Sequence, residues 1–99
     1  MSSREERRAQ NEAIFRAGNE AIVQNMPGTE PILPLICECG ASECLETIYV
    51  TPPEYEAVRS HSARFALSSG HEDETESVVD ELDRYSVVEK TGVGRAVVE

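Results

Sequence analysis

The residues of this chain best suited to chemistry are three cysteines that lie within one short stretch, from Cys37 to Cys44. Cys37 and Cys39 are one residue apart, and Gly40 follows them directly. A glycine accepts the positive φ angle that a tight turn requires, so this turn can direct two sulfur atoms toward one point. Cys44 brings a third sulfur. Three thiolates leave one ligand of a tetrahedral metal site to be supplied, and a histidine would complete it.

Two histidines, His61 and His71, compete for the fourth position. His71 follows a Ser-Ser-Gly turn, which would hold the ring rigidly after a predicted strand. His61 falls at the end of a predicted helix, where a histidine commonly bonds the last carbonyl groups. If neither histidine binds, then Glu38, Glu43 or water would complete the shell. The predicted metal ligands are Cys37, Cys39, Cys44 and His71.

Zinc is the predicted ion because tetrahedral sites rich in thiolates favour it, with iron as the alternative. Three thiolates make the ion a poor Lewis acid, and a catalytic zinc would need an open position and a nearby base. Glu72, beside His71, could act as a base, but it belongs to an acidic run that is typical of surface charge. The sequence therefore predicts a structural site and no enzyme. Cysteines that are simply small core residues remain the competing interpretation.

Length and composition favour the metal. A chain of 99 residues with 5% aromatic residues and no Trp predicts one small domain with a marginal core. A disulfide framework would leave one of the three cysteines unpaired. The sequence shows no signal peptide and no apolar run of membrane-spanning length, so we expect a cytoplasmic location with reduced thiols.

The charge is strongly acidic, with 19 Asp and Glu against 9 Lys and Arg and a net charge of −10. Acids and bases balance over residues 1–25, so the whole excess lies beyond them. Such a body repels phosphate backbones, which argues against nucleic-acid binding. It suits solubility, or a basic protein partner.

The predicted fold class is α+β. It combines an N-terminal amphipathic helix, a small and mostly antiparallel sheet, and one short helix, all pinned by the Cys3His site. The predicted boundaries are a helix at 1–26, a proline-rich linker at 27–34, a compact metal-stabilised domain at 35–91, and a flexible tail at 92–99.

The N-terminal helix is predicted to begin with a capping box of Ser3 and Glu6. Its apolar stripe consists of Ile14, Phe15, Gly18, Ile22 and Met26. The sequence Asn-Glu-Ala-Ile occurs twice, beginning at Asn11 and at Asn19, and both copies border the same face of the helix. Two interpretations stay open: the helix packs on its own domain, or it pairs with a second copy in a dimer or with another protein.

The clearest local signal is Thr51-Pro52-Pro53-Glu54. Thr51 can cap a helix, Pro52 suits the first helical position, and Glu54 can reach back to the cap. The helix is predicted to end near Ser60. Strands are predicted at 35–36, 45–50 and 64–67, and a solvated acidic loop at 72–76. For the two valine pairs at 78–79 and 87–88 we favour a β-hairpin over a helical turn.

Several motifs together resemble a family of small uncharacterised actinobacterial-type proteins. They are Asn11–Arg16 with Asn19-Glu20, Cys37-Glu38-Cys39 with Cys44, Thr51 with Glu54–Arg59, Phe65, Gly70-His71-Glu72 and Val87–Lys90. The resemblance implies an N-terminal helix, a metal site at Cys37, Cys39, Cys44 and His71, and a strand pair near the end. It implies no activity.

The leading functional hypothesis is a zinc-stabilised, non-enzymatic interaction module that acts through its N-terminal helix and acidic face. One alternative is a nucleic-acid-associated regulator of zinc-ribbon type, suggested by Arg4, Arg7 and Arg8. Another is a thiol or metal redox sensor, because neighbouring thiolates can release zinc on oxidation.

Overall fold

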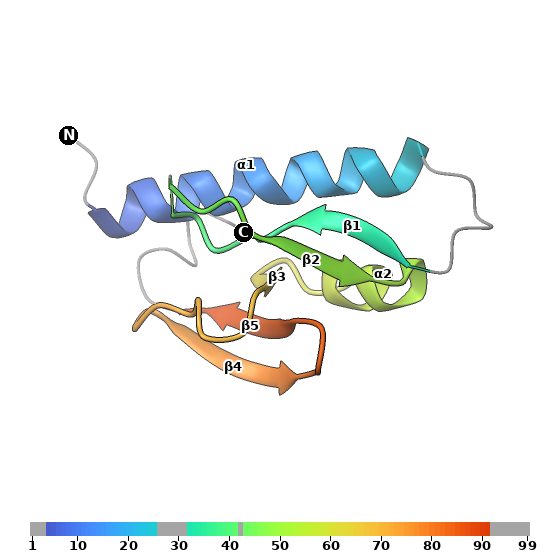
Figure 1. The fold of residues 1–99 in the computed structure, drawn as a ribbon. Coiled ribbons are helices and arrows are strands. Elements are labelled where there is room, and N and C mark those ends of the chain that lie inside the picture. Colours follow the sequence, from blue (N-terminus) through green and yellow to red (C-terminus); the bar gives the residue numbers. More distant parts are fainter. Residues whose placement is uncertain (1–3, 26–31, 42, 92–99) are drawn as a thin grey trace.

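A computed structural model describes residues 4–25, 32–41 and 43–91. The elements in this part of the chain are α1 (Arg4–Asn25), β1 (Leu33–Ile36), β2 (Thr47–Val50), α2 (Pro52–Arg59), β3 (Arg64–Leu67), β4 (Glu76–Glu81) and β5 (Ser86–Lys90) (Figure 1). The predicted α+β class, with a long first helix, one short helix and small antiparallel sheets, is confirmed. The predicted cap at Ser3, the helix stop at 26–28 and the tail at 92–99 lie outside the described residues.

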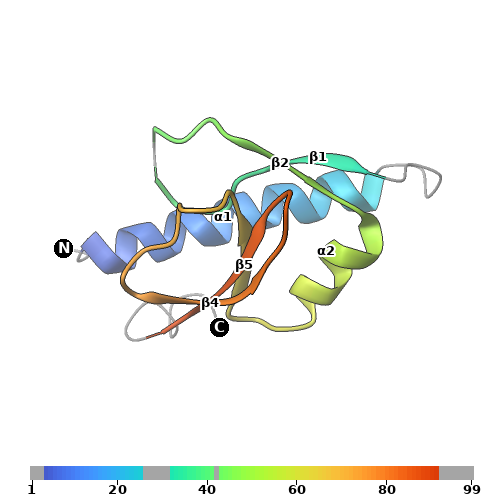
Figure 2. The same cartoon turned by 60° about the horizontal axis from the view of Figure 1, so that its bottom comes forward.

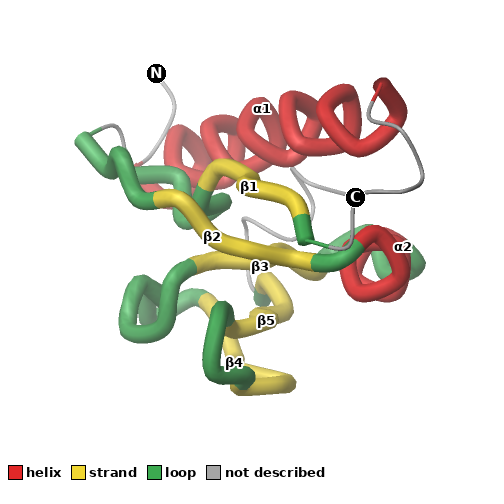
Figure 3. Tube along the Cα trace, turned by 45° about the vertical axis from the view of Figure 1, so that its right-hand side comes forward, coloured by secondary structure: helices red, strands yellow, loops and turns green. Residues whose placement is uncertain are grey.

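The strands form two sheets, one of β1 and β2 and one in the order β3-β5-β4. All pairs are antiparallel. Strand β1 lies beside α1 (Figures 1 and 3), and α1 also contacts the three-stranded sheet directly, because Arg16 lies over the Phe65 ring of β3. Figure 2 shows the molecule from another side. In this view the three-stranded sheet crosses the middle of α1, and α2 lies near the C-terminal end of α1. The two strand layers and both helices thus surround a common core.

The core is apolar and closely shared between the two sheets. Its largest side chains below 2% exposure include Phe65, Leu33, Leu35, Ile48 and Leu67. The alternation along β1 and β2 explains this: one face of the ribbon is buried and the other is exposed. Burial of these apolar side chains is the main hydrophobic contribution to the stability of the fold.

The buried face of α1 differs from the predicted apolar stripe. Ala9, Glu12 and Asn19 are 0% exposed, whereas Ile14 is 64% exposed. Phe15 lies half-buried at the edge of the contact. The predicted stripe was wrong at Ile14, whereas Ile22 of the same stripe packs against the core. The buried face also includes polar side chains with specific partners, which a hydrophobic pattern cannot reveal.

The predicted helix after Thr51 is present with its capping box, in which Thr51 Oγ1 accepts from the Glu54 amide and the Glu54 side chain accepts from the Thr51 amide. The hairpin of β4 and β5 is confirmed, with a bulge between Val78 and Asp80. Three boundaries differ. Strand β1 begins at Leu33, inside the range predicted as linker, and β2 begins at Thr47 rather than at residue 45. Glu76 is a buried strand residue rather than part of a solvated loop.

Candidate metal centre

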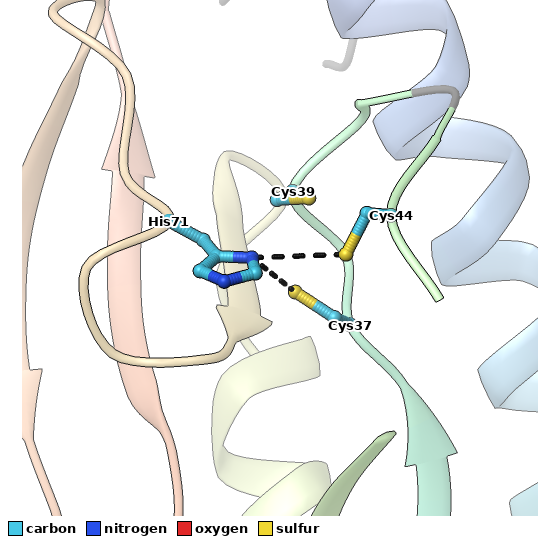
Figure 4. Close-up of side chains that lie close together, drawn as sticks. All are labelled: Cys37, Cys39, Cys44 and His71. Atoms are coloured by element: carbon cyan, nitrogen blue, oxygen red, sulfur yellow. Dashed lines mark hydrogen bonds between the residues drawn. The ribbon is translucent and has the colours of Figure 1, made fainter. Parts of the chain in front are cut away.

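The structure brings together the four residues predicted as ligands. One ligand atom from each of Cys37, Cys39, Cys44 and His71 lies within 4.8 Å of all the others. His71 Nδ1 is 3.6 Å from Cys37 Sγ and 3.7 Å from Cys44 Sγ. In Figure 4 the imidazole ring points into the space between the three sulfur atoms. Two segments far apart in the sequence therefore meet at this point.

These separations fit a tetrahedral zinc ion. Bonds of about 2.3 Å to sulfur and about 2.0 Å to nitrogen place sulfur and nitrogen ligands about 3.5 Å apart, and two sulfurs about 3.8 Å apart. The two distances from His71 Nδ1 to sulfur, 3.6 and 3.7 Å, lie close to the first value. No two of the four ligand atoms lie more than 4.8 Å apart. The side chains would therefore move by only about 1 Å to reach the separations of a tetrahedral zinc site. The donor set of three thiolates and one imidazole is the kind that zinc prefers.

Two turns position the ligands. Gly40, at φ 79°, reverses the chain after Cys39 and returns it toward Cys44, whose amide donates to Ala41 O at 3.1 Å. Gly70, at φ 88°, forms the turn in which the His71 amide donates to Ser68 O at 3.0 Å. The turn predicted to present His71 is thus present.

Two of the three cysteines are buried. Cys37 and Cys39 are each 1% exposed, and Cys44 is partly exposed. Burial raises the pKa of the Cys37 thiol, and burial together with the adjacent Cys37 raises the pKa of Cys39 to about 12. The Ser68 amide donates to Cys37 Sγ at 3.2 Å, which favours negative charge on that sulfur. A divalent cation among the thiols would reverse the effect of burial and stabilise the thiolates.

Helix α1 holds both ligand-bearing segments. Asn11 Nδ2 donates to Gly40 O at 3.1 Å, and Asn19 Nδ2 donates to Ile36 O at 2.7 Å. The Ile36 amide donates back to Asn19 Oδ1 at 2.8 Å. On the other segment, Arg8 donates to His71 O at 3.2 Å. The two asparagines of the repeated Asn-Glu-Ala-Ile motif therefore fix the two ends of the segment that carries Cys37 and Cys39.

Glu38, between the two cysteines, is the residue of the site whose role the sequence did not reveal. It is 0% exposed. Its carboxylate accepts hydrogen bonds from Tyr55 Oη at 2.6 Å, Asn19 Nδ2 at 2.8 Å and the Ala66 amide at 2.9 Å. Burial raises the pKa of Glu38, while these donors oppose the rise. Glu38 thus links α1, α2 and β3 directly behind the ligand turn and does not face the ligand group.

The other candidates lie outside the ligand group. His61 is exposed at the end of α2, and its amide donates to Val58 O at 3.2 Å. Glu43 and Glu72 are exposed. Of the histidines considered, the structure places His71 with the cysteines.

The close approach of α1 to the cysteine turn gives a testable difference between two glycines. A Cβ at Gly40 would lie 2.7 Å from both Arg8 O and Glu12 Cγ, whereas a Cβ at Gly70 would meet nothing within 4 Å. Both have positive φ, so alanine strains either backbone by about 1–2 kcal/mol. At Gly40→Ala we expect a further loss of about 1–3 kcal/mol from overpacking.

Urea unfolding of the metal-loaded Gly40→Ala and Gly70→Ala proteins measures this difference. Because the backbone strain is matched, the comparison isolates the contact with α1. Equal losses in the two variants would show that the cysteine turn and α1 are not held as closely as the structure has them.

A second buried polar group lies next to the same helix turn. Lys90 Nζ is 2.9 Å from Glu12 Oε1 and 3.8 Å from Glu76 Oε2, and all three side chains are 0% exposed. Lys90 Nζ also donates to Thr75 Oγ1 at 3.0 Å. Two carboxyls share one ammonium, so one of them keeps its proton. Burial and the neighbouring Glu76 raise the pKa of Glu12 to about 9 against the opposing effect of Lys90.

This cluster predicts a pH dependence of stability. With a pKa raised from 4.5 to about 9, Glu12 keeps its proton in the folded chain where the unfolded chain has lost it. The stabilising proton is thus present at low pH. The free energy of unfolding falls as the pH rises from 4.5 to about 9. Glu12→Gln removes the titration, so its stability relative to wild type should rise between about pH 5 and pH 8, by up to about 1.4 kcal/mol per pH unit.

Denaturant unfolding at several pH values gives the slope, and the exposed Glu72→Gln serves as the control because its slope should equal that of wild type. A parallel pH profile for Glu12→Gln and wild type would contradict the protonated Glu12. The charged groups that face Glu12 are Glu76 and Lys90, so the pH profile belongs to the three-residue cluster and not to Glu12 alone.

Neither helix in the described part of the chain combines the length and apolar character needed to cross a bilayer. Comparisons of the chain with protein-family models, with curated proteins and with solved structures found no match.

Proposed function

We propose that this chain is a small zinc-stabilised module without catalytic activity, which binds a protein partner through its N-terminal helix and its acidic face. The observation that carries the proposal is the convergence of Cys37, Cys39, Cys44 and His71 within 4.8 Å. Four protein ligands close a tetrahedral site and leave no position for a substrate, as in structural zinc sites.

The surroundings of the ligands support a structural role. The contacts of Arg8, Asn11 and Asn19 bind the first helix to the ligand-bearing segments, so that the site connects elements from both halves of the chain. A core of this size commonly needs such a link. Zinc would supply folding free energy at this point.

The surface supports the interaction. Side chains on the outer side of α1 are exposed: Arg4, Arg7, Gln10, Ile14, Ala17, Ala21 and Gln24. Exposed acids of the second half of the chain are Glu72, Glu74, Asp80, Glu81 and Asp83. A basic partner would meet complementary charge on the acidic side.

Cobalt substitution tests the closed site. The purified protein should contain about one zinc per chain by elemental analysis, and the cobalt form should show the visible bands of a tetrahedral thiolate site. Added azide should leave those bands unchanged, because no ligand position is open. A spectrum that changes with azide would indicate an open ion and would overturn the non-catalytic assignment, and absence of bound metal would overturn the site itself.

A second candidate, a nucleic-acid-associated regulator, has one specific observation in its favour. Arg4, Arg7 and Arg8 line a pocket of about 210 Å³ with Asn11 and Gly40, beside the cysteine turn. Glu43 lines the same pocket, and Arg8 pairs with Asp73 at 3.4 Å, which reduces the positive charge offered. A labelled RNA or DNA that fails to shift in a mobility assay at low salt would exclude this candidate.

A further inference from the structure

One face of the β1–β2 ribbon is left uncovered by the described part of the chain. The residues on it are Pro34 and Ile36 of β1 and Thr47 and Tyr49 of β2, and all four are exposed. The register pairs Pro34 with Tyr49 and Ile36 with Thr47, so the four form one continuous patch. None of them is charged, in a chain of which 28% of the residues are charged.

A groove and a protruding side chain adjoin this patch. The groove measures about 460 Å³ and is lined by Phe15 of α1, by Pro34, Leu35 and Ile36 of β1, and by the segment 44–47. Leu45 stands at its edge with 94% of its surface exposed, and Tyr49 is 51% exposed. Contiguous apolar surface of this kind marks interaction sites more often than single exposed residues do.

We propose that this face binds a second copy of the chain, with Leu45 of each copy entering the groove of the other. A two-fold interface is formed by the same surface patch on both copies, so the patch must be complementary to itself. The face that includes this patch also carries the projecting side chain of Leu45 and the groove that would receive Leu45 of the other copy. Among the described residues that line the groove, Glu46 is the one that carries a charge.

Charge limits the faces through which two copies can meet. With a net charge of −10, two copies that met through their acidic sides would repel each other. The β1–β2 face lets them meet with Glu46 as the one acid lining each groove. Added salt should therefore strengthen the dimer by screening the remaining repulsion between the two chains.

The inference rests on the proposed function, because Leu45 directly follows the ligand Cys44. Metal bound at Cys44 would fix the segment that presents Leu45 and forms one wall of the groove. Dimer formation should therefore require the metal.

Sedimentation equilibrium of the metal-loaded full chain, from micromolar to millimolar concentration, tests the proposal. Wild type should approach twice the 10.9 kDa chain mass. Leu45→Asp should weaken association at least about tenfold, because it places a charge in the apolar groove. Val78→Asp is the matched control: Val78 is 44% exposed on β4, outside this face, and its replacement should leave association unchanged.

Metal content, measured on each sample, separates the two proposals. A wild type that holds stoichiometric zinc and stays monomeric overturns the dimer and leaves the metal site intact. If neither Leu45→Asp nor Tyr49→Asp weakens the dimer, the dimer uses another face and the proposed interface is overturned as well. If Leu45→Asp loses zinc, the result for Tyr49→Asp decides, since Tyr49 lies on β2 and is not adjacent to a ligand. If the purified chain holds no metal, the proposed function is overturned. If that metal-free chain still forms a dimer, the proposed dependence of the dimer on metal is overturned as well.

Discussion

We expect Cys39→Ser to abolish the cooperative unfolding transition of this chain. Structural zinc contributes about 10–16 kcal/mol of binding free energy in small zinc domains. Folded domains as a whole are stable by only about 5–15 kcal/mol. Losing one thiolate from the site therefore removes a contribution as large as the net stability. Cys39 is 1% exposed, so the serine would also leave a hydroxyl in an apolar site.

Circular dichroism and elemental analysis measure the two consequences together. The variant should lose bound zinc and give a broad melting curve, and chelation of wild type should produce the same state. The prediction fails if Cys39→Ser loses zinc and keeps a sharp transition close to that of wild type, because the cysteines would then be core residues with an accessory ion.

The two histidines provide the matched control. His71 Nδ1 lies 3.6 Å from Cys37 Sγ, whereas His61 is exposed at the end of α2. His71→Ala should lose most of the metal affinity, and His61→Ala should keep it and lose less than about 0.5 kcal/mol of stability. Equal effects of the two replacements would show that neither ring is a specific ligand.

Sequence features were predicted well where the necessary information lies in adjacent residues. Thr51, Pro52 and Glu54 specify a helix start through contacts within four positions, and the structure has those contacts. Gly70 before His71 specifies a turn in the same local way. Grouping His71 with the cysteines needed only one further assumption, that a tetrahedral site requires a fourth ligand.

Buried polar contacts of α1 with distant partners were not predicted. Glu12 and Asn19 lie on the buried side of α1 because Lys90 and Ile36, far along the chain, supply their partners. Hydrophobic periodicity assigns such residues to solvent. The repeated Asn-Glu-Ala-Ile motif was the available signal, and the structure gives it a role within the chain: its asparagines bind the backbone on both sides of the cysteine pair.

Replacement of Glu38 is the second change that we expect to lower the stability of the fold strongly. Its carboxylate accepts three hydrogen bonds, from Tyr55, Asn19 and Ala66, inside a site with 0% exposure. Glu38→Ala removes the acceptor for all three donors. Asn19 keeps a bond to Ile36 O and Tyr55 keeps a longer one to Arg16 O, at 3.3 Å, but the Ala66 amide loses its bond from this side chain. We expect a loss of about 3–5 kcal/mol.

Glutamine should not rescue the site. All three groups around Glu38 are donors, so the amide NH2 of Glu38→Gln would face a donor whichever way it turned. We expect this nearly isosteric variant to lose about 1–3 kcal/mol. Glu46→Ala is the control, since Glu46 is exposed and should change stability by less than about 0.5 kcal/mol.

A double-mutant cycle with Tyr55→Phe shows whether the carboxylate acts through the hydroxyl. Tyr55 Oη is 2.6 Å from Glu38 Oε2, the shortest of the three bonds to that carboxylate. The two replacements should therefore be non-additive by about 1–2 kcal/mol in urea unfolding of the metal-loaded protein. Additive losses would place the effect of Glu38 in the other two bonds. If the losses appeared only after chelation, bound metal would be sufficient to hold the Cys37–Cys39 segment without Glu38.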